Sequence, residues 1–451
     1  MTKSVNEREL ILGILLEVTE REAYSHLIIR NVLDKYQYLD KQERAFITRV
    51  SEGTIENMIL LDYIINSFSK VKTNKMKPVI RNILRMSVYQ LKFMDSVPDS
   101  AVCNEAVKLA VKKGFHSLKG FVNGVLRNIS RGLDEIEYPS EEKNREEYLS
   151  VLYSMPRWIV DKWLEEYDYT QVKSMLEGFF EKNGTTIRCN MSKISPEELK
   201  AALEKENITV ASSKILNYAF EISDYNRINK IAAFEKGLFQ VQDISSMLVV
   251  EAAGIREGNY VLDICAAPGG KSLHAADRLN GSGHVEARDL TENKIALIKE
   301  NIDRSGFANI TAKQFDARIY DETTKEKADV VIADLPCSGL GVIGKKTDIK
   351  YKMTPDKQKE LVKLQREILH TAAEYVKPGG VLIYSTCTIN KEENIDNVNW
   401  FIENHSFFAE SIEKYISPAL KCDTAEDGYI QLLPDNGETD GFFIARLKKE
   451  K

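Results

Sequence analysis

DICAAPGGKS, residues 263–272, is the part of this 451-residue sequence from which its fold follows most directly. The segment that leads into it, 259–265, is apolar enough for a buried strand. The segment that continues from its last two residues, KSLHAADRL (271–279), has helical spacing. An acid at a strand end, then a glycine loop and a helix, can hold a nucleotide-like ligand at a sheet edge. The spacing is neither GxGxxG nor GxxxxGK[ST], so neither a dinucleotide nor a triphosphate is the first choice of ligand.

Strand and helix patterns alternate through the rest of the C-terminal half. The further predicted strands are 283–289, 309–316, 328–336 and 380–387, and helical segments at 291–306 and 355–377 lie between them. This alternation predicts a doubly wound α/β domain with a mainly parallel sheet, over residues 236–451. Because parallel strands end at one edge, the residues that follow the strands should lie together.

Acidic residues end the first three strands, at Asp263, Asp289 and Asp316. Gly269 and Gly270 allow close approach of the backbone, whose amides can hold the carboxylate of a small zwitterion. Asp289 is placed to accept two ribose hydroxyls, and Asp316 could meet an adenine amino group. One such acid alone would be an ordinary surface carboxylate. Together, the three acids indicate an adenosyl ligand with an amino-acid tail, S-adenosylmethionine.

Two cysteines follow the next two strands, Cys337 in ADLPCSGLG (333–341) and Cys387 in GVLIYSTC (380–387). Free cysteines are usually inert and buried, but these lie just past the strands, where ligands bind. With Asp334 they should converge beside the sulfonium methyl group. A thiolate that adds to carbon 6 of a pyrimidine makes carbon 5 nucleophilic, and Asp334 could hydrogen-bond a cytosine. Chemistry alone does not say which thiol attacks.

The N-terminal part has a different pattern. Residues 1–133 repeat apolar residues at three- and four-residue spacing, which predicts a helical bundle. Pro78 is predicted to open one helix and Ser100 to cap the next. Residues 134–150 are acidic and are predicted to be a linker.

A small α+β module is predicted over 151–235. Its first helix, 154–167, should be capped by Ser154, with Trp158 and Trp163 in packing positions. A strand at 185–194 and a helix at 195–208 follow.

Charge is unevenly distributed along the chain. Net charge is −6, yet residues 67–131 hold thirteen Lys and Arg against three acids, and 132–150 hold seven acids. Such asymmetry fits a nucleic-acid face on the helical part, and on charge alone a solvated helical surface fits as well. Residues 343–366 carry eight Lys and Arg against three acids. Within them, GKKTDIKY (344–351) is predicted to be a basic loop that meets RNA.

The six cysteines have no CxxC spacing and the six histidines do not cluster with them. We therefore expect neither a disulfide framework nor a metal site. No apolar run reaches 18 residues, and the N-terminus is typical of a helix start, not of a signal peptide. A cytoplasmic protein without membrane contact, and a monomer, is the expectation.

These motifs resemble those of the NOL1/NOP2/Sun family of RNA cytosine-C5 methyltransferases. The resemblance is carried by GLFQVQDISSML (237–248), DICAAPGGKS, ADLPCSG, YSTCTINKEEN (384–394) and TDGFFIARL (439–447). The helical part is similar to a NusB-type RNA-binding domain, through ILRMSVYQLKFMDSVP (83–98), NEAVKLAVKKG (104–114) and GFVNGVLRNI (120–129). The combination implies a Rossmann-like class I methyltransferase domain that acts on 16S rRNA before full 30S assembly, at cytosine 967.

The resemblance also implies residue roles. Cys387 would be the nucleophile and Cys337 would assist product release. The cofactor would be held by Cys265, Ala266, Ala267, Pro268, Gly269, Gly270 and Lys271, with Asp289, Asp316 and Asp334. The sequence departs from the family pattern at Ser272, Arg288 and Thr347, where Thr, an apolar residue and Pro are commoner. The alternatives are the same reaction on another RNA such as tRNA, or a non-catalytic RNA-binding factor.

Overall fold

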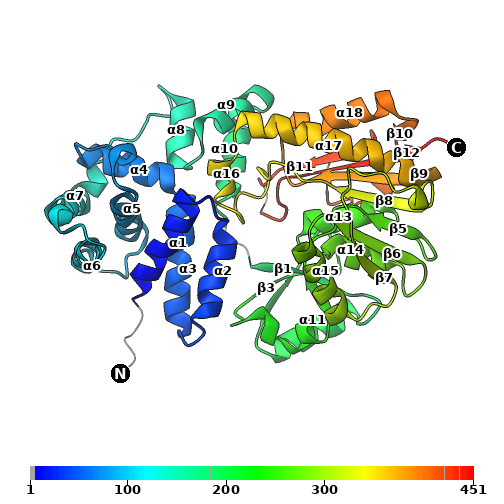
Figure 1. The fold of residues 1–451 in the computed structure, drawn as a ribbon, viewed down its shortest axis with the longest axis horizontal. Helices are drawn as coiled ribbons and strands as arrows, with labels where there is room; N and C mark the ends of the chain where they lie inside the picture. The colour runs from blue at the N-terminus through cyan, green and yellow to red at the C-terminus, as the bar shows by residue number, and fades with distance from the viewer. Residues whose placement is uncertain (1–5, 182–183, 421, 436) are drawn as a thin grey trace. The chain divides into compact units, whose positions relative to one another are not determined.

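A computed structural model describes residues 6–181, 184–420, 422–435 and 437–451. The chain forms two compact units, drawn in Figure 1. Unit 1 is Met1–Glu177 with the short segment Ile343–Lys352, and unit 2 is Gly178–Val342 with Met353–Lys451. Among the described residues, no helix has the length and apolar character to cross a membrane.

Unit 1 is all-helical, as predicted for its N-terminal part. Its helices are α1 (Glu7–Glu20), α2 (Ser25–Lys35), α3 (Lys41–Glu56), α4 (Met58–Phe68), α5 (Pro78–Phe93), α6 (Asp99–Lys112), α7 (Lys119–Gly132), α8 (Arg145–Leu152), α9 (Arg157–Glu166), most of α10 (Tyr169–Gly178), and α16 (Ile349–Lys352). Helix α5 lies at the centre, because it packs against α1, α3, α4, α6 and α7 and is buried along residues 82–90.

Local signals explain several helix starts in unit 1. Asp40 and Glu43 form a reciprocal capping box before α3, and Pro78 opens α5 as predicted. The predicted cap at Ser100 is wrong: α6 begins at Asp99, after Pro98, so the fixed φ of proline sets this start. The stretch predicted as a linker, 134–150, contains the first residues of α8.

Ser154 does not cap the helix that follows it. That helix, α9, begins at Arg157 after Pro156, and Ser154 itself has a φ of 50°. Its Oγ accepts the backbone N–H of Ile59 at 2.8 Å, at the start of α4. The hydroxyl therefore caps a helix 95 residues away in sequence. Trp163 is fully buried, as predicted for a packing residue.

Unit 2 begins with a small α+β module. Its four antiparallel strands lie in the order β2-β3-β1-β4: β1 (Thr185–Cys189), β2 (Thr209–Ser212), β3 (Ala219–Ser223) and β4 (Phe239–Val241). The predicted helix is α11 (Pro196–Lys205), opened by a capping box between Ser195 and Glu198, and α12 (Ala232–Glu235) follows. The apolar residues of this module are continuous with those of the larger sheet, so the two share one core.

The larger sheet of unit 2 is the predicted doubly wound one. Its order is β10-β12-β9-β8-β5-β6-β7, where β5 is Tyr260–Asp263, β6 His284–Asp289, β7 Ile310–Gln314, β8 Ala328–Asp334 and β9 Val376–Thr386. These five are parallel. Three further strands are antiparallel and were not predicted: β10 (Phe407–Ala409), β11 (Tyr429–Leu432) and β12 (Phe442–Lys449).

Helices cover both faces of this sheet (Figure 1). One face packs against α13 (Ile244–Ala253), α14 (Gly270–Arg278) and α15 (Glu292–Ser305); the other packs against α17 (Pro355–Tyr375) and α18 (Ile395–Asn404). Neighbouring strand residues alternate between the two cores, as Val261 and Leu262 do. The carboxyl ends of the parallel strands are thus left for a ligand site.

Candidate active site

The acid that ends β5 is deeply buried. Asp263 is 1% exposed, and Ser272 Oγ in α14 donates a hydrogen bond to its Oδ2 at 2.5 Å. Burial raises the pKa of Asp263 to about 7, although Ser272 and nearby Lys271 favour the charged form. The family departure at position 272 keeps a hydroxyl, which is the group that this contact needs.

The loop after β5 is held against the end of β6. Backbone N–H groups of Ala266 and Ala267 donate to the carbonyl of Arg288 and to Asp289 Oδ2, both at 2.9 Å. Asn301 donates to the Pro268 carbonyl. Burial raises the pKa of Cys265, so this thiol stays protonated.

Two glycines shape the turn from this loop into α14. Gly269 has a φ of +104°, which side chains rarely allow. A Cβ on Gly270 would be in ordinary van der Waals contact with the side chain of Gln242, at 3.8 Å. Helix α14 begins directly at this glycine turn, and the N-terminus of a helix is a place where an anion can be held.

Asp289 ends β6 and Asp316 lies two residues beyond β7, and the two carboxylates differ in their surroundings. Asp289 is 3% exposed; its Oδ1 accepts from the N–H of Leu290 at 2.7 Å and from Lys294 Nζ at 2.9 Å. Asp316 is half-buried, and hydrogen bonds from Arg318 hold its pKa below the usual range. No hydrogen bond connects Asp316 to the 265–271 loop among the described residues.

Asp334, at the end of β8, joins the loop side to the thiol side. Lys271 Nζ donates to its Oδ2 at 2.6 Å and Ser385 Oγ donates to its Oδ1 at 2.8 Å. Lys271 also lies over the ring of Phe442, 5.3 Å from its centroid. The structure thus brings together residues from three separate motifs, as the strand order predicted.

The two predicted cysteines meet at the ends of β8 and β9. Cys337 Sγ and Cys387 Sγ lie 3.2 Å apart and neither forms a disulfide. The hydrogen bond with Cys387, burial and the charge of Glu393 raise the pKa of Cys337. Cys337 is therefore held as a thiol at neutral pH.

A buried polar network fixes both thiol loops, and we did not predict it. Glu393 is fully buried; its Oε1 accepts the N–H of Ser338 at 2.8 Å and its Oε2 accepts from Asn390 at 2.8 Å. Gln365 of α17 donates both to Glu393 and to the carbonyl of Pro336. The signal was present in YSTCTINKEEN, where a charged residue stands six positions after Cys387.

Two glycines allow the loops to approach. A Cβ on Gly341 would lie 1.9 Å from the carbonyl oxygen of Gly441, so a side chain there is impossible without displacing the backbone. Gly341 N–H also donates to the carbonyl of Cys387 at 3.0 Å. The PC and TC motifs are thereby joined through the backbone as well as through the thiols.

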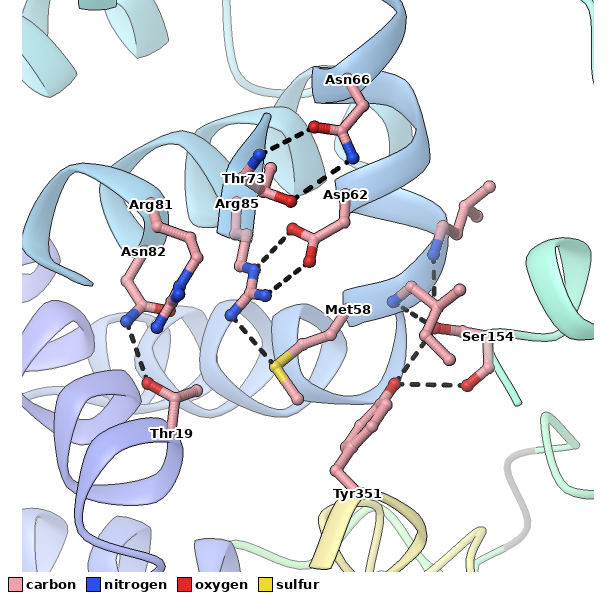
Figure 2. A network of polar contacts seen from close by, with 12 residues as sticks. Thr19, Met58, Asp62, Asn66, Thr73, Arg81, Asn82, Arg85, Ser154 and Tyr351 are labelled. Atoms are coloured by element: carbon pink, nitrogen blue, oxygen red, sulfur yellow. Dashed lines mark hydrogen bonds and ion pairs between the residues drawn. The ribbon is translucent and has the colours of Figure 1, made fainter. Parts of the chain in front are cut away.

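The basic segment of unit 1 is partly neutralised within the unit. Arg81 pairs with Glu20, and Arg85 makes a two-pronged contact with Asp62, drawn in Figure 2. Lys112 and Lys113 both contact Glu9. Exposed lysines remain before α5, at Lys70, Lys72, Lys75 and Lys77. The candidate RNA face is therefore smaller than the charge count alone indicates.

The prediction that all of 344–351 meets RNA is wrong for its second half. Thr347, Asp348 and Lys350 are 8%, 1% and 2% exposed, because they pack into unit 1. Lys345 and Lys346 are exposed and can still contact RNA. The other family departure, Arg288, is buried in ion pairs with Glu286 and Asp321.

Three families match successive parts of the chain. A family of 16S rRNA methyltransferases, RsmB/F, matches residues 251–448. The NusB family matches residues 5–131, and the ferredoxin-like domain of RsmF/B-like methyltransferases matches residues 155–229.

Relatives match this chain over nearly its full length. A probable ribosomal RNA small subunit methyltransferase B of Bacillus subtilis is 36% identical, over 99% of this chain and 100% of the relative. A probable ribosomal RNA small subunit methyltransferase B of a Synechocystis species is 29% identical, over 99% of this chain and 100% of the relative. The crystal structure of PH0851 is 27% identical, covers 99% of both chains and has a TM-score of 0.81.

Proposed function

Because the chain belongs to the RsmB/F family of 16S rRNA methyltransferases, with an N-terminal NusB domain, we propose that it methylates carbon 5 of a cytosine in 16S rRNA. The proposed target is cytosine 967. The observation that carries the proposal is the pair of thiols 3.2 Å apart beside Asp334. Methyl transfer to an oxygen or an amine needs no such pair, whereas pyrimidine carbon 5 requires activation through carbon 6.

S-adenosylmethionine is the proposed cofactor, and when bound it supplies an electrophilic methyl group. Its carboxylate would be held by amides of the 265–271 loop, where Gly269 and Gly270 leave room for close approach. Asp289 would accept the ribose hydroxyls and Asp316 the adenine amino group. The donor set fits: a glycine turn, a helix start and carboxylates follow one another at the strand ends.

Cys387 is the proposed nucleophile. Its thiolate forms a bond with carbon 6 of an unstacked cytosine, and the electrons of the 5,6 double bond make carbon 5 nucleophilic. After carbon 5 gains the methyl group it loses its proton to solvent. The electrons of that C–H bond restore the double bond and expel Cys387 as a thiolate.

Cys337 is the proposed aid to release. The hydrogen bond with Cys387 and burial raise the pKa of Cys337, which favours its thiol form. As a thiol it can donate a hydrogen bond to the departing Cys387 sulfur. Asp334 would bind the cytosine amino group or ring nitrogen, which uracil lacks in that arrangement.

Unit 1 is the proposed rRNA-binding part, with Lys70, Lys72, Lys75 and Lys77 as phosphate contacts. We propose that a monomer acts in the cytoplasm, before full 30S assembly. The proposed division of labour follows the bounds 1–133 for RNA binding, 134–150 as a connection, 151–235 as a supporting module and 236–451 for catalysis.

Bisulfite mapping of 16S rRNA tests the reaction and the target together. RNA from a strain lacking the gene should lose 5-methylcytosine at position 967. A plasmid copy of the wild type should restore it, and a Cys387→Ala copy should not. Loss of the modified base from a tRNA instead would overturn the proposed substrate.

A further inference from the structure

Cys337 and Cys387, here called the thiol pair, are close neighbours as well as two separate participants in the proposed reaction. Their Sγ atoms lie 3.2 Å apart, and both cysteines are free and half-buried. An S–S bond is about 2.05 Å long, so a disulfide would require these sulfur atoms to approach by only about 1.1 Å. The reduced pair is therefore already close to the separation of a disulfide.

The backbone brings the two thiol loops together before either cysteine is reached. Strands β8 and β9 are neighbours in the sheet, with Asp334 opposite Ser385. The N–H of Leu335 then donates to the carbonyl of Ser385 at 3.0 Å. Cys337 comes two residues after Leu335, and Cys387 comes two residues after Ser385. The two cysteines therefore follow their strands at matching positions.

Hydrogen bonds also join the two loops beyond the thiols. Ser338 Oγ and Thr388 Oγ1, on the residues directly after the two cysteines, share a hydrogen bond at 2.8 Å. Gly341 N–H donates to the carbonyl of Cys387 at 3.0 Å. The loops are thus in contact on both sides of the sulfur atoms. All of these residues belong to unit 2, so the arrangement is a property of that unit by itself.

Other cysteines of the chain are placed differently. Cys103 is buried in the hydrophobic core of unit 1, and Cys189 is buried in that of unit 2. Cys422 is half-buried, and its thiol shares a hydrogen bond with the hydroxyl of Thr424. The reaction of a thiol with an oxidant follows its exposure, and it is reversible when a second thiol lies beside it. The thiol pair meets both conditions.

We propose that the thiol pair is an oxidation site, at which a peroxide converts the two cysteines into a reversible disulfide that stops methyl transfer. In the disulfide Cys387 is no longer a thiolate, so it cannot add to carbon 6 of cytosine. This consequence rests on the nucleophile role proposed for Cys387. Transient disulfides of this redox-sensing kind are compatible with a reducing compartment.

The oxidation takes place in two balanced steps. The Cys387 thiolate attacks one oxygen of hydrogen peroxide: an S–O bond forms, the O–O bond breaks, hydroxide leaves, and Cys387 becomes a sulfenic acid. The Cys337 sulfur then attacks the Cys387 sulfur. The S–S bond forms, the S–O bond breaks, and the departing hydroxide takes the proton of the Cys337 thiol to give water. Overall, two thiols lose two electrons and two protons, and the peroxide is reduced to two molecules of water.

Treatment of the purified full chain with hydrogen peroxide tests the proposal. The intact mass should fall by two hydrogen atoms, and proteolytic mapping without reductant should give a peptide in which Cys337 is linked to Cys387. Methyl transfer to a 16S rRNA fragment should be lost in proportion to the linked fraction. Dithiothreitol should break the link and restore the activity.

Cys337→Ser removes the second thiol and keeps a side chain of similar size. Its Cys387 should gain oxygen instead of forming a link, and oxidation as far as the sulfinic acid should not be reversed by dithiothreitol. Cys422→Ala is the matched control and should still form the link between Cys337 and Cys387. Both readouts are masses, so they do not depend on the activity of the variants.

Three results would overturn the proposal. The first is a wild-type protein whose Cys387 gains oxygen without forming a link, and the second is a link to another cysteine in place of Cys337. The third is full methyl transfer by the linked protein. Failure of the proposed function would look different, because the fully reduced wild type would then transfer no methyl group while the link still formed. That result would support the oxidation site and remove only its effect on methylation.

Discussion

The candidate site at the carboxyl ends of the parallel strands has two halves, and these are built in different ways. On the carboxylate half, at the ends of β5 to β7, the acids have partners 1 to 22 residues away in sequence: Ser272 for Asp263, Leu290, Lys294 and Ala267 for Asp289, and Arg318 for Asp316. On the thiol half, at the ends of β8 and β9, side chains 28 to 55 residues apart in sequence form the buried network around Glu393. Several partners on the first half are local, at one to nine residues, whereas the second half depends more on contacts between distant segments.

We expect this difference to separate cofactor binding from the chemical step. Changes on the thiol half should alter turnover and the fate of the RNA adduct while leaving cofactor affinity intact. Changes on the carboxylate half should act on cofactor binding and on its pH dependence. Lys271 and Asp334 join the halves, so they are the positions where this separation should be least complete.

Replacement of the nucleophile should have the largest effect. Cys387→Ala should lower turnover by about 10³-fold or more, because the carbon 6 adduct can no longer form. A denaturing gel should show no covalent RNA complex, and equilibrium dialysis should show unchanged S-adenosylmethionine affinity. Normal turnover would refute Cys387 as the nucleophile. A loss of affinity for S-adenosylmethionine would contradict the expectation that changes on the thiol half leave cofactor binding intact.

Removal of the second thiol should have a smaller effect of a different kind. Cys337→Ala should lower turnover by about 10²-fold, within the range for assistance by a positioned acid or base. Its RNA adduct should accumulate, since attack is intact and release is not. Cys422→Ala serves as the control and should turn over normally. The Cys422 thiol is half-buried and shares a hydrogen bond with the hydroxyl of Thr424.

The carboxylate half should show a pH dependence that the thiol half lacks. The folded pKa of Asp263 is raised to about 7, so its contribution to stability is complete at pH 4 and is lost as pH rises through 7. The free energy of unfolding should fall by up to about 1.4 kcal/mol per pH unit over that window.

Asp263→Asn should flatten this slope, because the amide does not titrate. Urea unfolding of the full chain at pH 5 and pH 7 measures the difference. The exposed Asp303→Asn is the control and should keep the slope of the wild type. A slope unchanged in Asp263→Asn would show that another group titrates.

The network around Glu393 should have the smallest of these effects. Glu393→Gln keeps the shape but weakens the hydrogen bond from Ser338, which should lower turnover about tenfold, equivalent to about 1.4 kcal/mol. Cofactor affinity should not change. Steady-state kinetics with varied S-adenosylmethionine measure both the turnover number and the KM for the cofactor. Glu403→Gln, at an exposed position, is the control. A selective rise in the cofactor KM would contradict the independence of the two halves.

Much of the site could be predicted because its parts are local. A glycine loop between a strand and a helix, and polar residues just past apolar runs, are readable in sequence. The rule that parallel strands end at one edge then brings Cys337 and Cys387 together. The antiparallel strands β10 to β12 were missed because β10 and β11 have only three and four residues, and pairing rather than pattern defines them.

By itself, the sequence determined the helical and α/β halves, the glycine loop after the first parallel strand and the two thiols at strand ends, since these depend on periodicity and on order along the chain. The tertiary structure decided what each polar group is paired with. Ser154 caps α4 instead of the helix beside it, and Lys350 is buried at the end of α3 instead of facing RNA. These partners are 95 and 294 residues apart in sequence. Hydrogen bonding of a buried group depends on what packing brings near, and no local pattern encodes that.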